Sequence, residues 1–390
     1  MYDAIVAGLG PAGSTVAYHL ASRGLKVLGV DKERFPRYKS CGGCISTKIK
    51  GLVDFDISPA IEETVLGATF TYKSARAMDV MSDSPLGYNV MRETFDDLFF
   101  RKAREAGALL IDGIRVISAE DTGGSVKVSL ADGRSFEGKV LVGADGSSGF
   151  TGRELFGLKP RESAVSITAE VPCKRAERDY DGKLFIDFGS VPYGYAWIFP
   201  KKNYLSVGIA GDTSKVKGRI KEYFNAFVTT HEALKGLDVS DRKGWTVPLY
   251  YEGLPSSVKG RVLLVGDTGH LVDPFLGEGI YFAIRTAKAA SSAIIDYIEG
   301  TGSLDVYQGW LEREIVPEFR SAGKLADLIY NHPRLWYSML EKDPDIMLKY
   351  YDVIRGEEEC ARFYRWVLDK VKSKPWKVLR GWIESRFLPG

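Results

Sequence analysis

The chain has little of what marks a secreted, membrane-spanning or metal-binding protein. Its 390 residues include four cysteines and four histidines, which are too few and too scattered for a disulfide framework or a metal site. No apolar run reaches the roughly 18 residues that a spanning helix needs. The formal net charge of +2 gives no general attraction to nucleic acid. We therefore expect a cytoplasmic protein without a metal or a nucleic-acid partner.

The sequence does contain enough apolar residues for more than one core. Hydrophobic residues make up 45% and charged residues 27% of the chain, as in globular proteins. Because 390 residues exceed one simple core, we expect two or three structural regions. An aromatic content of 12% suits a large apolar cavity.

A glycine-rich motif follows the first predicted strand, residues 3–7. Gly8 allows a tight turn, Gly10 lets the backbone approach a pyrophosphate, and Gly13 allows the following helix to pack on the strand. Asp31 ends the second predicted strand, where a carboxylate can accept hydrogen bonds from ribose hydroxyls. An ordinary strand–turn–helix explains the glycines alone, but strand, helix and acid together predict dinucleotide binding.

Two later motifs repeat the order of a short apolar strand followed by glycine and aspartate. The first ends in Asp145 and Gly146, and the second in Gly266 and Asp267, with a predicted helix after Gly279. Such an aspartate can accept from a ribityl hydroxyl, and the helix start offers amides and a positive dipole end. Either motif alone is typical of a capped turn. The three motifs together predict FAD, held by distant parts of the chain.

These motifs, in this order, resemble the FAD superfamily of the p-hydroxybenzoate hydroxylase type, which includes aromatic hydroxylases, halogenases and geranylgeranyl reductases. Residues 36–43, Pro-Arg-Tyr-Lys-Ser-Cys-Gly-Gly, resemble the Cys-Gly-Gly segment of geranylgeranyl reductases. Residues 193–201 are similar to their Tyr-x-Trp-x-Phe-Pro signature. The chain thus resembles the geranylgeranyl reductase family, including digeranylgeranylglycerophospholipid reductases, over about residues 1–300, and residues 301–390 carry no matching motif.

The expected fold class is α/β, or α+β overall, with a Rossmann-type FAD-binding domain, an antiparallel-sheet substrate domain and a helical C-terminal region. The chain is expected to leave the nucleotide-binding fold and return to it twice, so the first two domains are discontinuous. The predicted ranges are 1–66, 92–158 and 255–300 for the FAD-binding domain, 67–91 and 159–254 for the substrate domain, and 301–390 for the helical region.

The resemblance implies an FAD-dependent reductase that saturates the C=C bonds of geranylgeranyl chains, on ether-linked membrane lipids or on a related substrate such as a prenyl diphosphate. Hydride from flavin N5 reacts poorly with a plain alkene, so the site also needs a proton donor and groups that tolerate a developing cation. Aromatic faces stabilise a cation by about 0.5–2 kcal/mol each. The electron donor stays open between NAD(P)H, ferredoxin and another reductant.

Three residues are candidates for the catalytic site. Tyr195 and Trp197 would share one face of a strand; on sequence alone an ordinary sheet core is preferred for them, and the family resemblance favours a role in the site. Cys41 has basic neighbours, which lower a thiol pKa and make the thiol reactive. Cys44 departs from the family pattern, and it creates a Cys-x-x-Cys pair that is either redox-active or two unremarkable thiols.

The predicted cofactor site combines the three motifs with residues implied by the resemblance. Arg92 precedes a Phe-Asp pair, where the superfamily has an arginine that contacts FAD. The predicted cofactor-binding residues are Gly8, Gly10, Pro11, Ala12, Gly13, Asp31, Lys32, Cys41, Gly42, Gly43, Arg92, Asp145, Gly146, Gly266, Asp267, Gly277, Gly279 and Ile280.

Alternatives stay open. A flavin monooxygenase shares these motifs, and a prenyl-binding escort protein could keep the fold without flavin. A halogenase is disfavoured because Tyr195 stands where its first tryptophan belongs. Residues 372–390 mix basic and large apolar residues, a pattern typical either of peripheral contact with an anionic membrane or of a final helix packed on the body.

Overall fold

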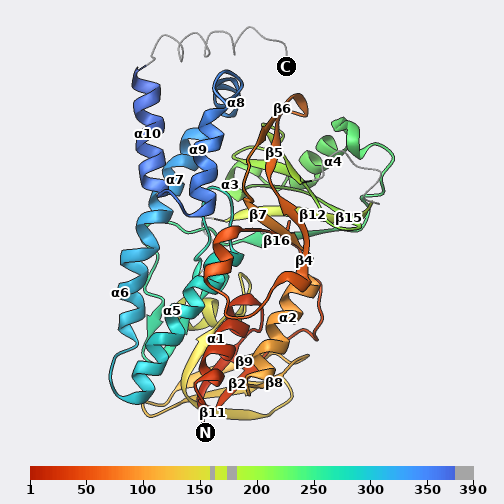
Figure 1. The fold of residues 1–390 in the computed structure, drawn as a ribbon. Helices are drawn as coiled ribbons and strands as arrows, with labels where there is room; N and C mark the ends of the chain where they lie inside the picture. The colour runs from red at the N-terminus through yellow and green to blue at the C-terminus, as the bar shows by residue number, and fades with distance from the viewer. Residues whose placement is uncertain (159–162, 174–181, 374–390) are drawn as a thin grey trace.

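The computed structural model describes residues 1–158, 163–173 and 182–373. Figure 1 shows two main layers of sheet, one near the N-terminus and one toward the C-terminal end, with a column of helices along one side. The α/β fold class predicted from the sequence is confirmed.

The first sheet has the strand order β17-β18-β11-β1-β2-β8. Its central strand β1 pairs in parallel with β2 and β11, and β11 pairs in parallel with β18. The three strand–glycine motifs of the sequence follow β1, β11 and β18, and the parallel pairing of these strands brings the three turns to the same edge of the sheet. The strands are β1 (Tyr2–Ala7), β2 (Val27–Val30), β8 (Leu109–Ile111), β9 (Val116–Asp121), β10 (Val126–Leu130), β11 (Ser135–Gly143), β17 (Val258–Lys259) and β18 (Val262–Leu264).

Alternation along β1 assigns the two faces of this sheet. Ala4 and Val6 belong to a core shared with five helices. Ile5 and Ala7 point to the other face, where the β9–β10 hairpin covers them. The helices of the first core are α1 (Pro11–Ser22), α2 (Arg92–Glu105), α5 (Ile280–Glu299), α6 (Asp305–Glu314) and α7 (Val316–Tyr330).

The second sheet has seven strands in the order β16-β12-β15-β14-β13-β5-β6. We predicted an antiparallel sheet here, and one pair differs, because β13 and β5 run in parallel. Strand β5 comes from a separate part of the chain, so no hairpin sets its direction. The strands are β5 (Gly67–Tyr72), β6 (Ala75–Met81), β12 (Ala164–Pro172), β13 (Lys183–Phe188), β14 (Gly194–Pro200), β15 (Tyr204–Asp212) and β16 (Arg242–Val247).

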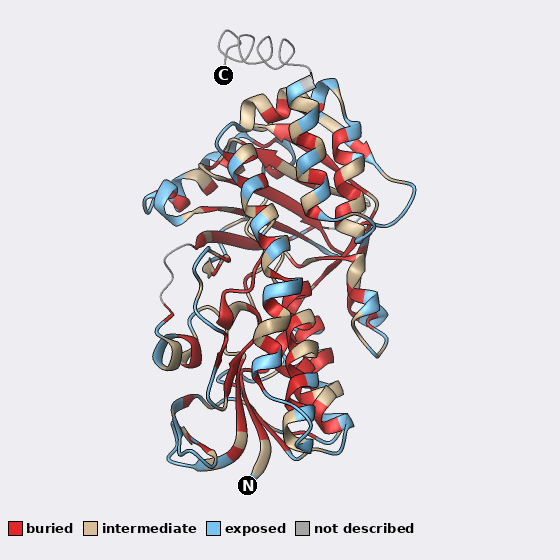
Figure 2. Ribbon diagram, turned by 90° about the vertical axis from the view of Figure 1, so that its left-hand side faces the viewer, coloured by how far each residue is buried: buried red, intermediate tan, exposed pale blue. Residues whose placement is uncertain are grey.

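Alternate side chains of strand β14 point to opposite faces of the second sheet. Ala196 and Ile198 pack toward α4, whereas Tyr195, Trp197 and Phe199 face the opposite side. Figure 2 shows that the central strands of this sheet are largely buried, whereas the edge strands β6 and β16 are more exposed. The elements on the α4 side are α3 (Thr213–Val216), α4 (Ile220–Thr230) and the 3-10 helix η5 (Glu232–Leu234).

A third, small sheet, which the sequence did not indicate, lies between the two larger ones. Strand β7 (Gly87–Val90) pairs antiparallel with β3 (Cys44–Ser46) and β4 (Ile61–Val65). It therefore joins a segment expected in the substrate domain to two segments expected in the FAD-binding domain. Nearby short helices are η1 (Thr47–Gly51) and η2 (Ser58–Ala60), and others are the π-helix η3 (Thr151–Leu155) and the 3-10 helix η6 (Gly266–Gly269).

The C-terminal helices pack on the face of the second sheet that carries Tyr195 and Trp197, opposite α4. Helices α8 and α9 contact β5 and β6, and α10 packs against α7, at the upper end of Figure 1. Their apolar residues share a core with Phe70 and Phe188. The remaining helices are α8 (Pro333–Lys342), α9 (Asp345–Arg355) and α10 (Cys360–Ser373).

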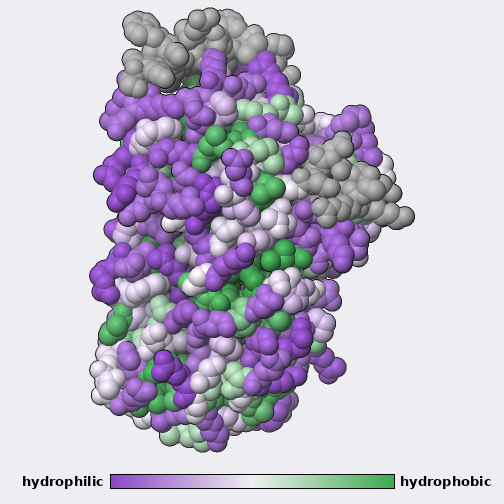
Figure 3. Space-filling model, in the orientation of Figure 1, coloured by the Kyte–Doolittle hydropathy of each residue, from purple (hydrophilic) through white to green (hydrophobic). Residues whose placement is uncertain are grey.

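The segment predicted to contact a membrane lies almost entirely outside the described residues, which end at residue 373. In the part of the chain that the structure describes, no helix combines the length and apolar composition needed to cross a bilayer. From the side drawn in Figure 1, the surface is mostly hydrophilic, with hydrophobic residues in small scattered patches (Figure 3).

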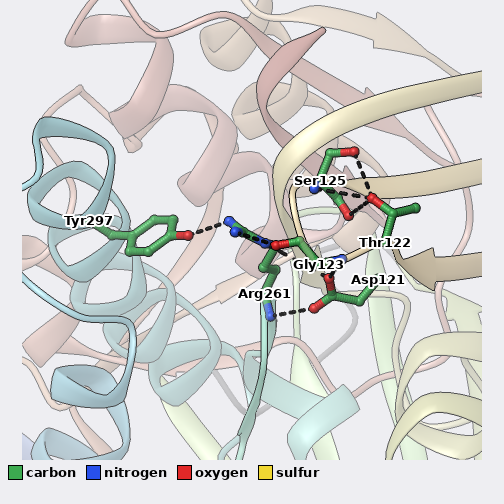
Figure 4. Close-up of polar contacts among 6 residues, drawn as sticks. All are labelled: Asp121, Thr122, Gly123, Ser125, Arg261 and Tyr297. Atoms are coloured by element: carbon green, nitrogen blue, oxygen red, sulfur yellow. Dashed lines mark hydrogen bonds and ion pairs between the residues drawn. The ribbon is translucent and has the colours of Figure 1, made fainter.

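Arg261, just before β18, connects the returning strand to helix α5 and to the β9–β10 turn (Figure 4). Its guanidinium donates to the Tyr297 hydroxyl on α5, and its Nη2 donates to the Gly123 carbonyl at 2.9 Å. Its backbone N–H donates to Asp121 at 3.2 Å. The side chain therefore fixes the β9–β10 turn against the returning strand.

We predict that Arg261→Met lowers the free energy of unfolding by about 1–2 kcal/mol, because two charge-assisted hydrogen bonds are lost at a partly buried site. Urea unfolding of both proteins measures this difference. Arg134→Met is the matched control, since among the described residues the Arg134 side chain pairs only with Asp132 of its own turn. An equal loss of stability in the two variants would contradict the bridging role of Arg261.

Candidate active site

One continuous cavity connects the first sheet to the C-terminal helices. Its volume is about 680 Å³, within the range of ligand sites. At one end it is lined by the glycine turn after β1, and at the other by apolar residues of α7 to α10. The wall between these ends is formed by the Cys41–Gly43 loop and strand β14.

The nucleotide end has the close backbone approach that a dinucleotide fold requires. A Cβ at Gly13 would lie 1.8 Å from the Gly8 carbonyl oxygen, and one at Gly8 would lie 2.3 Å from that of Ala144. Gly8 has a φ of +93°, which a side chain would strain. Helix α1 begins after Gly10 with no side-chain cap. Its first amides are thus directed at the cavity.

Arg37 supplies a cation at this end. Its Nη2 would lie 3.2 Å from a Cβ placed on Gly10. The other terminal nitrogen, Nη1, is buried and has no hydrogen-bond partner among the described residues. A buried guanidinium N–H without a partner is costly. Together with the uncapped helix start, it fits the diphosphate of a dinucleotide.

Asp31 lies where the sequence predicts the ribose-binding acid, but its carboxylate is partly engaged already. It accepts from Leu9 N–H at 2.6 Å and from Glu33 N–H at 2.8 Å. Burial raises its pKa, while these N–H donors act in the opposite direction. Two lone pairs remain for a ribose. The adjacent Lys32 is exposed at the cavity mouth.

The two strand-end aspartates differ in what they contact. Asp145 accepts from the Thr151 N–H at 2.9 Å and from the Thr151 hydroxyl at 2.5 Å, so its carboxylate closes its own loop. Both aspartates line the cavity, and the Asp267 Oδ1 would lie 3.2 Å from a Cβ on Gly279. Asp267 is therefore beside the N-terminus of α5, which also has no side-chain cap. The carboxylate best placed for a ligand is that of Asp267.

The structure places most of the other predicted cofactor-binding residues around the same cavity. Gly266 does not line it but packs behind it, where a Cβ would lie 3.1 Å from that of Ala283. Those in the cavity wall are Gly10, Pro11, Ala12, Cys41, Gly42, Gly43, Arg92, Gly146, Gly277, Gly279 and Ile280.

The Cys-Gly-Gly loop packs directly against the aromatic face of β14. A Cβ on Gly42 would lie 2.8 Å from the Phe199 ring and 3.1 Å from the Trp197 Nε1. Gly43 has a φ of +77°, and its Cβ would lie 2.3 Å from the Val90 carbonyl oxygen. Only glycines allow this approach, which brings the two motifs of the family resemblance into contact.

Tyr195 and Trp197 lie on the cavity face of β14, with ring centroids 5.8 Å apart. The Tyr195 hydroxyl donates to the Leu276 carbonyl at 2.6 Å. The Trp197 Nε1 is buried, without a partner among the described residues. The two rings therefore border the point where the apolar end of the cavity meets the nucleotide end.

Cys41 contacts a buried charge network. Arg92 donates two hydrogen bonds to Asp96, both 2.8 Å long, and lies within hydrogen-bonding reach of the Cys41 thiol. Arg37 pairs with the same carboxylate at 3.0 Å. Burial alone would lower the pKa of Arg92, but Asp96 and Cys41 hold it raised. The arginine predicted to contact FAD is thus also a neighbour of Cys41.

Cys44 differs from Cys41 in its surroundings. It begins β3, and burial raises the pKa of its thiol to about 12. A thiol of this kind forms little thiolate at neutral pH. Both cysteines are free, so the structure favours the interpretation in which Cys44 is an ordinary buried thiol and not part of a redox pair.

The apolar end of the cavity was not indicated by any motif. It presents ring faces and aliphatic groups, and two of its tyrosine hydroxyls donate to backbone carbonyls, those of Tyr330 to Phe275 and of Tyr351 to Val80. The helical residues that line it are Ile329, Tyr330, Trp336, Met347, Tyr350, Tyr351, Ile354 and Phe363. Amphipathic helix patterns could have indicated burial of these residues, but not a cavity beneath them.

Comparison with known proteins identifies the family. The geranylgeranyl reductase catalytic domain model matches residues 166–240. A digeranylgeranylglycerophospholipid reductase of Thermoplasma acidophilum is 30% identical over 321 residues, which are 76% of this chain and 79% of the relative. The chain belongs to the geranylgeranyl reductase family. A further family member, the geranylgeranyl diphosphate reductase of Rhodobacter capsulatus, is 29% identical over 78% of each chain.

Solved structures agree on the fold. A geranylgeranyl bacteriochlorophyll reductase-like protein from Thermoplasma acidophilum has a TM-score of 0.79 at 22% identity, covering 98% of this chain and 99% of that one. The halogenase PltM, solved in complex with phloroglucinol and FAD, has a TM-score of 0.68 at 16% identity, covering 93% of this chain and 85% of that one. The fold is therefore shared by reductase-like and halogenase flavoproteins.

Asp273 organises the loop between Asp267 and α5 that lines the cavity. Its Oδ1 accepts from the N–H groups of Phe275 at 2.8 Å and Leu276 at 2.6 Å. Burial raises its pKa to about 7, although these N–H groups lower it, and Glu278 adds to the rise. The protonated form is therefore favoured in the folded protein over the unfolded one.

We predict that this residue makes stability fall with rising pH. A raised carboxyl pKa contributes stability below the unfolded value, and the contribution is lost as pH passes through about 7. Between about pH 5 and pH 8 the loss should be about 2–3 kcal/mol. Urea unfolding across this range should show a weaker pH dependence for Asp273→Asn, which keeps the acceptor oxygen. Identical slopes in the two proteins would contradict the assignment.

Proposed function

We propose that this protein is an FAD-dependent reductase that saturates C=C bonds of geranylgeranyl chains, on ether-linked membrane lipids or a related prenyl substrate such as a prenyl diphosphate. The proposal is supported chiefly by the single cavity, which joins a dinucleotide crevice to an apolar chamber at Cys41, Tyr195 and Trp197. Family membership supports a prenyl substrate.

The nucleotide end would hold FAD through groups that need a ligand. The amides of α1 and the unpaired nitrogen of Arg37 suit the diphosphate, and Asp31 suits the adenosine ribose. Asp267 and the amides of α5 suit the ribityl chain and the flavin ring. When bound and reduced, the flavin supplies hydride from N5.

The apolar end would bind the prenyl chain and exclude water. The hydroxyls of Tyr195, Tyr330 and Tyr351 are engaged with backbone carbonyls, so these residues offer apolar ring faces to the substrate, which favours burial of a hydrocarbon at about 25 cal/mol per Å². The ring faces of Tyr195 and Trp197 would stabilise positive charge on the more substituted alkene carbon. Cys41 would position the alkene or deliver the proton to the less substituted carbon.

The partners follow from this chemistry. The reductant that reloads the flavin is NAD(P)H, ferredoxin or another donor, and the chain has no second glycine fingerprint for a nicotinamide. Peripheral contact of residues 372–390 with a membrane, from a protein otherwise in the cytoplasm, stays a prediction.

The decisive experiment incubates the dithionite-reduced protein with a geranylgeranyl lipid under anaerobic conditions and measures product mass. We expect a gain of two hydrogens for each double bond reduced, and no change when dithionite is omitted. A product with added oxygen, formed in air with a reduced nicotinamide, would instead support the monooxygenase. A colourless protein that releases no flavin on denaturation would support the escort function.

Cys41→Ala tests the residue at the junction. We expect FAD content to be kept and alkene reduction to slow by about 100-fold, the lower end of the range for loss of a proton-transfer group. Cys173→Ala is the matched control, because Cys173 is buried in the α4 side of the second sheet. Unchanged turnover of Cys41→Ala in the mass measurement would remove Cys41 from the mechanism.

A further inference from the structure

Lys39 is a cation in the cavity wall to which the proposed reaction assigns no task. It stands two residues before Cys41, and its ammonium lies 3.6 Å from the centroid of the Trp245 ring. No carboxylate in the described ranges lies within ion-pair distance of this ammonium, and Asp267 is the acid that acts on it most strongly. Its close contact is therefore an aromatic face, and not a counter-ion.

Strand β16 fixes Lys39 in this position. Lys243, two residues before Trp245 on the same strand, lies 4.4 Å from the centroid of the Tyr38 ring. The Ser40 hydroxyl donates to the Lys243 carbonyl at 3.3 Å. Three consecutive residues of the loop are thus held by alternate positions of one strand, so Lys39 cannot easily swing into solvent.

The other cations nearby already have a carboxylate partner. Arg92 and Arg37 share the carboxylate of Asp96, at 2.8 and 3.0 Å. Burial lowers the pKa of Lys39 to about 7, with Asp267 opposing this shift and the two arginines adding to it. A cation held in this way lacks negative charge, which a ligand in the cavity can provide.

The position of Lys39 indicates which part of a bound ligand it would contact. Arg37 is the cation beside Gly10, at the diphosphate end. Lys39 instead lies over the Trp245 ring, two residues before Cys41, and the acid that most strongly opposes the lowering of its pKa is Asp267, beside the start of α5. Under the proposed function, this is where the flavin ring would lie.

We propose that Lys39 stabilises the anionic, reduced form of the flavin ring, with Trp245 as its positioning residue. The inference rests on the proposed binding of FAD and extends it to the control of redox potential. A cation beside a ring that gains negative charge favours reduction, more strongly in a low-dielectric cavity than in water.

The test is the midpoint potential of the FAD-loaded protein, measured without prenyl substrate and below the pKa of Lys39. For Lys39→Met we expect the preference for reduced over oxidised flavin to fall at least tenfold, which is about 30 mV for a two-electron couple. Lys39→Arg should retain most of the potential, and Lys127→Met, an exposed lysine on β10, should leave it unchanged.

Titration with oxidised FAD distinguishes control of the potential from simple binding of the cofactor. Weaker binding of FAD to Lys39→Met with an unchanged potential would make Lys39 a diphosphate anchor and overturn the proposal. An unchanged potential and unchanged binding would overturn it as well. If Lys39→Met does not fold, Lys39→Gln replaces it, with the same expected fall relative to Lys39→Arg.

This test is independent of alkene reduction. A lowered potential in a protein that reduces no prenyl lipid would support the role of Lys39 and contradict the proposed substrate. An unshifted potential in an active reductase would contradict only the role of Lys39.

Discussion

The contact between the Gly42–Gly43 backbone and the aromatic face of β14 is the constraint on which the rest of the site depends. A single methyl group on Gly42 would meet Phe199 at 2.8 Å. Because the loop follows β2 of the first sheet and β14 belongs to the second, this contact brings the nucleotide crevice and the apolar chamber together. Cys41, Tyr195 and Trp197 meet at that junction as a consequence.

The positively charged side chains follow one another along the cavity, from the glycine turn toward the apolar end. Arg37 lies at the glycine turn with one nitrogen unpaired, Arg92 is locked to Asp96 beside Cys41, and Lys39 rests on Trp245 near Asp267. Beyond Tyr195 the wall is apolar. Such a gradient suits a ligand that is charged at one end, aromatic in the middle and adjacent to a hydrocarbon, as the proposed reductase needs.

Particular residues show how far the sequence could predict this site. The strand–glycine–helix pattern at Gly8 and Gly13 indicated a close backbone approach, and the structure has it. The same reasoning treated Asp145 and Asp267 alike, but Thr151 occupies the first carboxylate. Side-chain contacts within a loop leave no periodic trace in a sequence. The parallel pairing of β5 with β13 was missed for a similar reason, since pairing between distant segments has no local signal.

The sequence by itself determined the α/β architecture and the family, because glycines at tight turns and in the Cys-Gly-Gly segment are local requirements of backbone geometry, and the Tyr-x-Trp-x-Phe-Pro motif is a signature of the family. Only the tertiary structure decided what residues 301–373 do. Their helices close the apolar end of the cavity with side chains from α7 to α10. Many combinations of large apolar residues can fill such a wall, so burial there requires only hydrophobicity and volume, and no motif records it.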